Sequence, residues 1–207
     1  MSDTRSTSHD VERELAALLA RRSRAVLGDL DPRLETPPAG DLVPASVLVL
    51  LERGPGYRMV FTRRTTTVDH HKGEVSFAGG MRDPEDADAT ATALREAWEE
   101  LGLDPAQVTV LGELDELVTV TNFRVTPVVG VVDADLEFQP NRDEVEHVLR
   151  VPMTHLRDPA QWFEDTRTWR GQVHLLRSCR FGDDIIWGAT SRMLQNFLAV
   201  VPEHLLP

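Results

Sequence analysis

The segment from Ala89 to Leu101 constrains the fold more than any other part of the sequence. Its composition predicts a helix, and Gly102 follows as a favourable C-terminal stop. On a helical wheel with Leu94 at the origin and about 100° per residue, three apolar side chains fall within roughly 60° of it. These side chains are Ala97, Trp98 and Leu101. We therefore expect this face to pack on a sheet.

Three glutamates, Glu96, Glu99 and Glu100, share an arc of about 100° on the opposite side of this helix. At about 5 Å, each like-charged pair costs roughly 1 kcal/mol in water and about 3 kcal/mol at an effective dielectric constant of about 20. A solvated surface helix tolerates such a cluster, and a divalent cation neutralises it. Because the donors are carboxylate oxygens without nearby histidine or cysteine pairs, we expect Mg²⁺, with Mn²⁺ as the alternative.

A loop rich in glycine, aspartate and proline, residues 78–88, precedes the helix. Gly79 and Gly80 permit positive φ and close backbone approach, so the chain can turn sharply into the helix. An ordinary turn would use the same residues. A loop that leads into a helix N-terminus also presents free backbone amides to phosphate.

The rest of the chain predicts strands in the middle with helices that cover them. We expect strands at 45–52, 57–64, 74–77, 108–114, 117–121, 125–132 and 172–181, and helices at 11–25 and 188–201. The proline-rich stretch 28–44 is predicted to be a wrapping linker. This organisation indicates an N-terminal helix and linker over residues 1–44 and a main domain over residues 45–207.

Composition excludes several classes of partner. Acidic residues outnumber basic ones 34 to 22, and the formal charge of −12 disfavours nucleic acid polymers and anionic membranes. Cys179 is the only cysteine, so no intramolecular disulfide forms, and we expect a buried thiol. With no long apolar run and a polar N-terminus, we expect a cytoplasmic protein. The partners that we consider are a small nucleotide and a second copy of the chain in a homodimer.

The loop and helix together resemble a known motif. Gly80, Asp86 after five residues, and REAWEELGL (residues 95–103) after eight more are similar to the Nudix box. The usual box has glutamate where this chain has Asp86, and one residue fewer before the arginine. The resemblance implies an α/β Nudix fold, in which a mixed β-sheet is sandwiched between α-helices, and metal-dependent hydrolysis of a diphosphate bond.

The residues before the box resemble a motif of the coenzyme A diphosphatase branch: Thr62-x-Arg64, then Gly73-x-x-x-Phe77-Ala78-Gly79-Gly80. That branch has arginine where this chain has Asp69 and proline where it has Ala78. The resemblance implies that coenzyme A or its thioesters yield 3′,5′-ADP and 4′-phosphopantetheine. ADP-ribose, a dinucleotide or another nucleoside diphosphate derivative is the alternative substrate. A non-catalytic nucleotide-binding domain is the third hypothesis.

The resemblance also implies roles for individual residues. The expected metal ligands are Glu96, Glu99, Glu100 and the backbone of Gly80, with Arg95 orienting a glutamate. In the expected mechanism, a bound metal lowers the pKa of a water molecule. Glu96 or Glu100 accepts the proton of this water as the water attacks phosphorus. A later loop would add Glu144, with Glu146 as its alternative. The candidate substrate-binding residues are Arg63, Arg64, Lys72, Gly79, Gly80, Arg82, Phe123 and Arg124, with Phe123 as a stacking or a core residue. We expect His70 and His71 to be loop residues.

Overall fold

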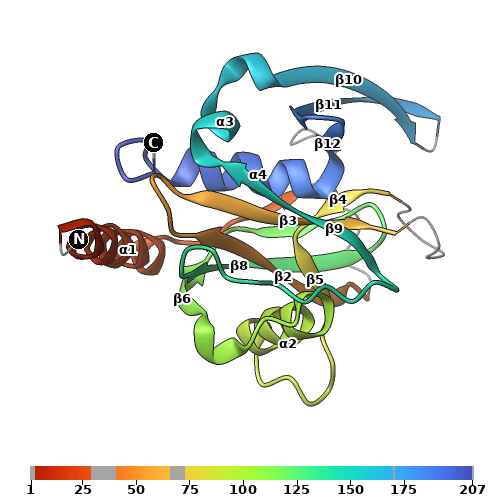
Figure 1. Cartoon of the computed structure of the whole chain (residues 1–207). Coiled ribbons are helices and arrows are strands. Elements are labelled where there is room, and N and C mark those ends of the chain that lie inside the picture. The colour runs from red at the N-terminus through yellow and green to blue at the C-terminus, as the bar shows by residue number, and fades with distance from the viewer. Residues whose placement is uncertain (1–2, 29–40, 66–72, 170, 207) are drawn as a thin grey trace.

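A computed structural model of the chain describes residues 3–28, 41–65, 73–169 and 171–206 (Figure 1). Its helices are α1 (Asp3–Arg21), α2 (Ala89–Leu101), α3 (Met153–Arg157) and α4 (Gly188–Val200), with 3₁₀ turns η1 (Pro105–Gln107) and η2 (Pro159–Gln161). The first strands are β1 (Val26–Gly28), β2 (Val43–Glu52), β3 (Arg58–Arg64), β4 (Val75–Ser76), β5 (Ala78–Met81) and β6 (Thr109–Glu113). The later strands are β7 (Glu116–Val118), β8 (Phe123–Val132), β9 (Val145–Pro152), β10 (Trp162–Trp169), β11 (Gln172–Phe181) and β12 (Asp184–Ile186).

Nine strands form one mixed sheet. Its main path runs β1-β7-β8-β2-β3-β4, while β5, β6 and β9 pair with β2, β8 and β3 respectively. The parallel pair of β2 and β8 stands at the centre and is in register from Val43 opposite Phe123 to Glu52 opposite Val132. A central strand is buried on both faces, which explains the almost unbroken apolar run of each strand.

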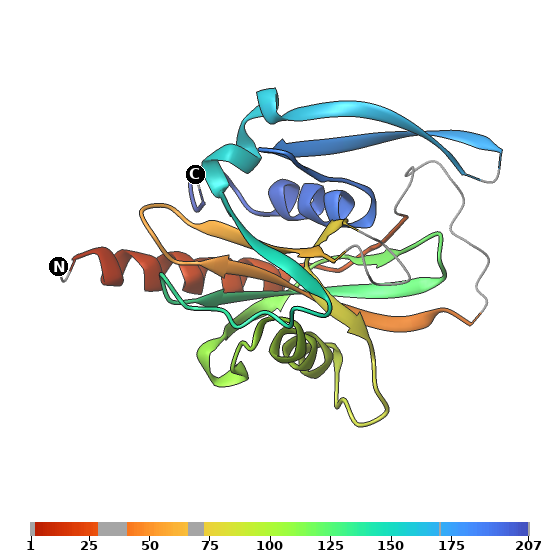
Figure 2. The same ribbon diagram turned by 45° about the vertical axis from the view of Figure 1, so that its right-hand side comes forward.

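Helices cover both faces of this sheet, as the α/β sandwich prediction requires. Helix α2 lies on one face, and α4 lies on the other, beneath a smaller antiparallel sheet of β10, β11 and β12 (Figures 1 and 2). Alternate residues of β2 serve two separate cores: Val49 and Leu51 join the larger core that includes α1 and α4, whereas Leu48 and Leu50 join the smaller core under α2. The α2 face carries the glutamates.

The N-terminal helix packs into the larger core through Leu15 and Leu19, which are almost fully buried. Glu12 anchors it further, because its carboxylate accepts hydrogen bonds from Arg53 at 2.6 Å and from Tyr57 at 3.0 Å. Helix α1 begins before the predicted residue 11 and ends at Arg21. Most of the predicted linker, residues 29–40, lies outside the described residues, and the division into two units stays a prediction.

Most predicted strands are present, but the first residues of the predicted loop 78–88 form β5 instead. The glycines of β5 have low strand propensity, yet antiparallel pairing with β2 from Ala78 opposite Leu48 to Met81 opposite Ala45 overrides it. The apolar pattern of the sequence also gave no indication of β1, β9, β10, β12 and α3. No helix in the described ranges is long and apolar enough to span a membrane.

Candidate active site

Helix α2 has the predicted bounds, and local signals at both ends explain them. Asp88 is the N-cap, and its side chain accepts a hydrogen bond from the Ala91 backbone N–H at 2.8 Å. At the other end, Gly102 adopts the left-handed conformation with φ of 63°, and its N–H bonds back to Trp98. These two local contacts fix the residues at which the helix begins and ends.

The orientation of α2 differs from our prediction. Trp98 is 54% exposed, whereas Ala93, Ala97, Leu101 and also Glu100 are buried. The buried side chains centre near Ala97, so the helix is rotated about its axis by roughly 60° from the predicted orientation. Small residues face the sheet because β5 approaches closely with its own small residues, and a tryptophan would not fit there. This rotation brings Glu100 from the predicted open face into the interface with the sheet.

The glycines of β5 leave room for the carboxylate of Glu96. A Cβ atom on Gly80 would lie 2.5 Å from Glu96 Oε1, and a Cβ atom on Gly79 would lie 2.4 Å from the Ser46 carbonyl oxygen. Both distances are far below a normal contact, so any side chain at either position would displace its neighbours. Glu96 consequently lies directly against the backbone at Gly80.

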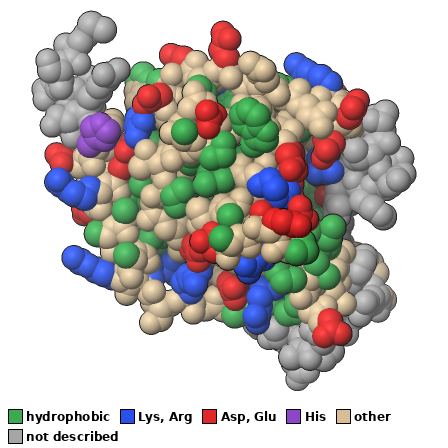
Figure 3. Space-filling view, turned by 90° about the horizontal axis from the view of Figure 1, so that it is seen from below, with side chains coloured by type: hydrophobic (Ala, Val, Ile, Leu, Met, Phe, Trp, Pro, Cys, Tyr) green, Lys and Arg blue, Asp and Glu red, His purple; other side chains and the backbone are tan. Residues whose placement is uncertain are grey.

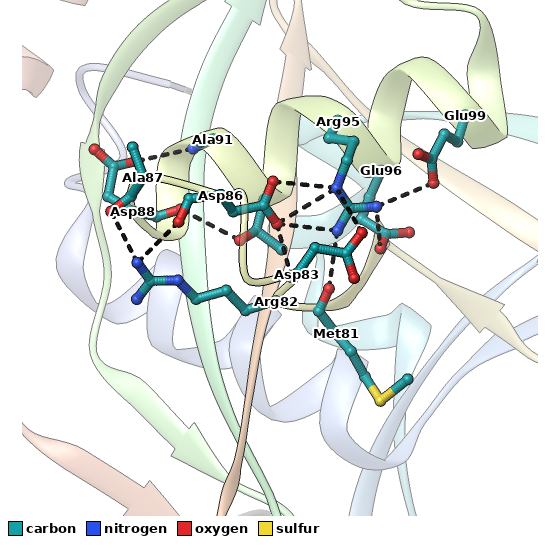
Figure 4. A network of polar contacts seen from close by, with 11 residues as sticks. Met81, Arg82, Asp83, Asp86, Ala87, Asp88, Ala91, Arg95, Glu96 and Glu99 are labelled. Carbon is teal, nitrogen blue, oxygen red and sulfur yellow. Dashed lines mark hydrogen bonds and ion pairs between the residues drawn. The ribbon is translucent and has the colours of Figure 1, made fainter.

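Arg95 organises the loop and two of the glutamates (Figure 4). Its Nε and Nη2 donate to the Asp86 carboxylate at 3.2 and 3.1 Å, and Nη2 also donates to the Met81 carbonyl oxygen at 2.9 Å. Its Nη1 donates to Glu96 at 2.9 Å and to Glu99 at 3.1 Å. The hydrogen bond from Arg95 is the main cause that holds the pKa of Asp86 down at about 2. Asp86 therefore anchors Arg95, a role that the sequence left open.

Glu100 is the most buried carboxylate of the helix, with 3% of its surface exposed. Burial is the main cause that raises its pKa to about 8. Arg64 opposes this shift with its Nη1 at 3.6 Å from Glu100 Oε1, whereas Glu96 and Glu144 add to it through their negative charges. The other oxygen, Oε2, is buried and has no hydrogen-bond partner among the described residues. A buried acceptor without a donor is costly, and a cation would satisfy it.

Of the two acidic residues predicted in the later loop, Glu144 is the one whose charge acts on Glu100. Arg64 Nη2 lies 3.9 Å from Glu144 Oε2, and the same guanidinium contacts Glu100. Glu146 instead pairs with Arg63 at 3.2 Å. Asn141, which the sequence analysis did not single out, donates its backbone N–H to the Glu100 carbonyl oxygen at 2.9 Å and its side-chain amide to Glu144 at 3.4 Å. Asn141 could not be found from the sequence, because its contact with Glu100 joins residues that are far apart in the chain.

The acidic residues fit a hard divalent cation. Burial is the main cause that raises the pKa of Glu96, and the charges of Glu99 and Glu144 add to the shift. In the part of the chain that the structure describes, no three acidic, histidine or cysteine side chains already lie in a metal-holding arrangement. Arginines neutralise the carboxylates instead, and acidic and basic side chains alternate on this face (Figure 3). The oxygen-only donors and the unsatisfied Oε2 of Glu100 nevertheless match the ligands that Mg²⁺ and Mn²⁺ prefer.

The remaining candidate residues separate into three groups. Arg82 donates to the carbonyl oxygens of Asp86 and Ala87 at 3.0 and 2.8 Å, so it supports the loop (Figure 4). Phe123 packs against the larger core, whereas Arg124 is exposed. Lys72, Asp69, His70 and His71 lie outside the described residues. Two hollows of about 210 and 570 Å³ open elsewhere, and the α2 glutamates line neither of them.

Comparisons with known proteins bear on this geometry. A family model described as the NUDIX domain matches residues 42–170. The mouse (Mus musculus) peroxisomal coenzyme A diphosphatase NUDT7 is 41% identical over 166 residues, which cover 77% of this chain and 70% of the mouse protein. An uncharacterized Nudix hydrolase, NudL, from Cronobacter sakazakii is 34% identical, with 77% of this chain and 83% of that protein covered.

Among solved structures, a MutT/nudix family protein from Enterococcus faecalis has a TM-score of 0.50 and 16% identity. The likeness covers 97% of this chain and 75% of the other, and at this identity it concerns the fold alone.

Proposed function

Because this chain belongs to the Nudix family and is a diphosphate hydrolase, we propose that it cleaves coenzyme A or its thioesters into 3′,5′-ADP and 4′-phosphopantetheine. Two findings support this substrate. The 41% identical mouse relative is named a coenzyme A diphosphatase, and Arg64, from the motif before the box, contacts the glutamate cluster.

The placement of Glu96 and Glu100 carries the catalytic part of the proposal. Both are turned toward the glycine strand: Glu96 lies against Gly80, and the Gly79 backbone offsets part of the rise in the pKa of the buried Glu100. With Glu99 and the Gly80 carbonyl they would hold Mg²⁺, with Mn²⁺ as the alternative. When bound, the cation would neutralise the diphosphate oxygens and make a water more acidic.

The protein's own residues supply the other steps. Asp86 holds Arg95, and Arg95 fixes the rotamers of Glu96 and Glu99, so the carboxylates are oriented before substrate arrives. The proton from the attacking water passes to Glu96 or Glu100. Separate Glu96→Gln and Glu100→Gln variants distinguish the two. Both variants weaken metal binding, but the variant of the proton acceptor also loses turnover when the metal is saturating, whereas the variant that only removes a ligand recovers turnover there.

ADP-ribose and related diphosphates are the second candidate class, favoured by Asp69 and Ala78. Ala78, however, is buried under α2 in the smaller core, so its departure from the branch pattern does not change the surface that faces a substrate. Asp69 lies outside the described residues.

The test is product identification with Mg²⁺ and a panel of coenzyme A, an acyl thioester, ADP-ribose and a dinucleotide. We expect 3′,5′-ADP and 4′-phosphopantetheine, with kcat/KM highest for coenzyme A or the thioester. Equal or better turnover of ADP-ribose contradicts the substrate assignment. If no diphosphate is cleaved with Mg²⁺ or Mn²⁺, the protein is a nucleotide-binding domain instead.

A further inference from the structure

We propose that Arg124 recognises a phosphate on the ribose of the substrate and thereby selects 3′-phosphorylated nucleotides over their dephosphorylated forms. This inference rests on the proposed function and extends it to a specificity-determining residue. Cleavage of the diphosphate does not itself require such a residue. The diphosphate is attached to the 5′ position of the ribose, whereas the phosphate that Arg124 would recognise is attached to the 3′ position.

Strand register places Arg124 on the same face of the sheet as the acidic site. In β8, Val128 packs in the smaller core under α2, and Arg124 is four residues earlier, so both point to the α2 face. Thr126 pairs with Ser46, and Ser46 pairs with Gly80. Arg124 is thus two strands across and two residues along from Gly80, about 12 Å between Cα atoms.

That separation suits a group one sugar ring away from the diphosphate, because an arginine side chain extends several ångströms from its Cα. Phe123, one residue earlier, points to the opposite face and packs against the larger core. Arg124 is therefore the residue of this pair that can reach a nucleotide bound at Gly80.

Three other described arginines near the acidic site are already engaged. Arg95 donates to two glutamates, an aspartate and a carbonyl oxygen, and Arg82 donates to two loop carbonyl oxygens. Arg64 lies between Glu100 and Glu144. Arg124, in contrast, has 49% of its side chain exposed and makes one loose ion pair, with its Nε 3.7 Å from Glu116 Oε2. Its guanidinium can therefore meet a phosphate without breaking a hydrogen bond.

The backbone that carries Arg124 is held firmly. The turn from β7 to β8 places Asn122 in the left-handed region with φ of 67°, and the Thr119 hydroxyl accepts the Phe123 N–H at 3.1 Å. Val43 of the central strand donates its N–H to the Asn122 carbonyl oxygen at 2.9 Å. A rigid base reduces the entropy lost when a long side chain binds an anion. Arginine also matches phosphate geometry with two parallel N–H donors, which lysine does not.

The experiment compares coenzyme A with 3′-dephospho-coenzyme A in the wild-type protein, Arg124→Gln and Arg124→Lys. We expect wild type to favour coenzyme A through KM, and Arg124→Gln to raise its KM about 10- to 100-fold, the range for a charge-assisted hydrogen bond. The KM for the dephospho substrate should change far less than the KM for coenzyme A in Arg124→Gln, and Arg124→Lys should restore part of the preference. Arg142→Gln, an exposed arginine that lines the 570 Å³ hollow, is the matched control.

Equal losses on both substrates would overturn the inference, since they would assign Arg124 a purely structural role through Glu116. An unchanged preference in Arg124→Gln would overturn it as well. Calorimetric binding of 3′,5′-ADP and 5′-AMP separates this inference from the proposed function. If coenzyme A is not cleaved, the proposed function fails. The role of Arg124 is then tested separately by these affinities. It is supported if the wild-type protein binds 3′,5′-ADP more tightly than 5′-AMP and Arg124→Gln does not. It is contradicted if the wild-type protein shows no such difference or if Arg124→Gln retains it.

Discussion

The burial of Glu100 predicts that the metal-free protein gains stability when this carboxylate is removed. Burial raises the pKa of Glu100 from an ordinary value of 4.5 to about 8 in the folded protein. A group whose folded pKa is raised stabilises the protein when protonated, and this stabilisation is lost as pH rises from about 4.5 through about 8. Above that range the wild-type protein contains a buried charge that Glu100→Gln lacks.

The size of the stability gain follows from the difference between the folded and the ordinary pKa of Glu100. Since each whole number of pKa difference corresponds to about 1.36 kcal/mol, the rise from 4.5 to about 8 corresponds to at most roughly 5 kcal/mol. Glu100→Gln also loses the attraction of Arg64 at 3.6 Å, which offsets part of the gain. We expect a net increase in the free energy of unfolding of about 2 to 4 kcal/mol at pH 9, or roughly 5 to 15 °C in Tm, falling toward zero at pH 5.

Urea denaturation in EDTA at pH 5 and pH 9 measures this difference. Glu99→Gln is the matched control, because the Glu99 side chain is 52% exposed and its replacement removes no buried charge. Glu100→Gln should also lose most of its turnover. The reasoning is refuted if Glu100→Gln is no more stable than wild type at pH 9, or if Glu99→Gln gains as much.

Four further substitutions test the geometry of α2 and its loop. Trp98→Ala should lower the free energy of unfolding by less than about 1 kcal/mol because its ring is half exposed, while Leu101→Ala should cost about 2 to 5 kcal/mol in the same urea assay. A larger cost at Trp98 would contradict the observed rotation. Gly80→Ala should reduce kcat at least about tenfold, since its Cβ would lie 2.5 Å from Glu96 Oε1 and displace that carboxylate. Steady-state kinetics measures this loss, and an unchanged circular dichroism spectrum shows that the variant is folded. Asp86→Asn should cost about 1 to 2 kcal/mol in stability and also lower kcat, because the arginine that it holds is released; unaltered kinetics would argue against this anchor.

The sequence predicted the fold class and the bounds of α2 because the responsible signals are local. Gly102 ends the helix, and the stretch of glycines and aspartates precedes it, so neither depends on distant contacts. Alternation of apolar residues likewise predicted the central strands. Strands β9 and β10 escaped prediction because charged residues such as Glu146, Arg150 and Glu164 interrupt their apolar patterns. Their pairing with β3 and β11 supplies the missing stability.

The rotation of α2 about its axis could not be predicted from the sequence, because it depends on contacts with β5. The helical wheel placed Trp98 on the packed face because it is apolar and lies close to Leu94, whereas close approach of the β5 strand selects alanines at the interface. Glu100 then enters a buried position that no rule of hydrophobic patterning would give to a carboxylate. Such violations concentrate at functional sites, where chemistry rather than packing determines the residue.

The proposed metal site requires that Glu96 and Glu100 converge on a divalent cation beside Gly80. Anomalous scattering from crystals soaked in Mn²⁺ locates such a cation. We predict an anomalous peak within bonding distance of both carboxylates and next to the Gly80 carbonyl oxygen. A peak only elsewhere, or none at saturating Mn²⁺, would contradict the claim.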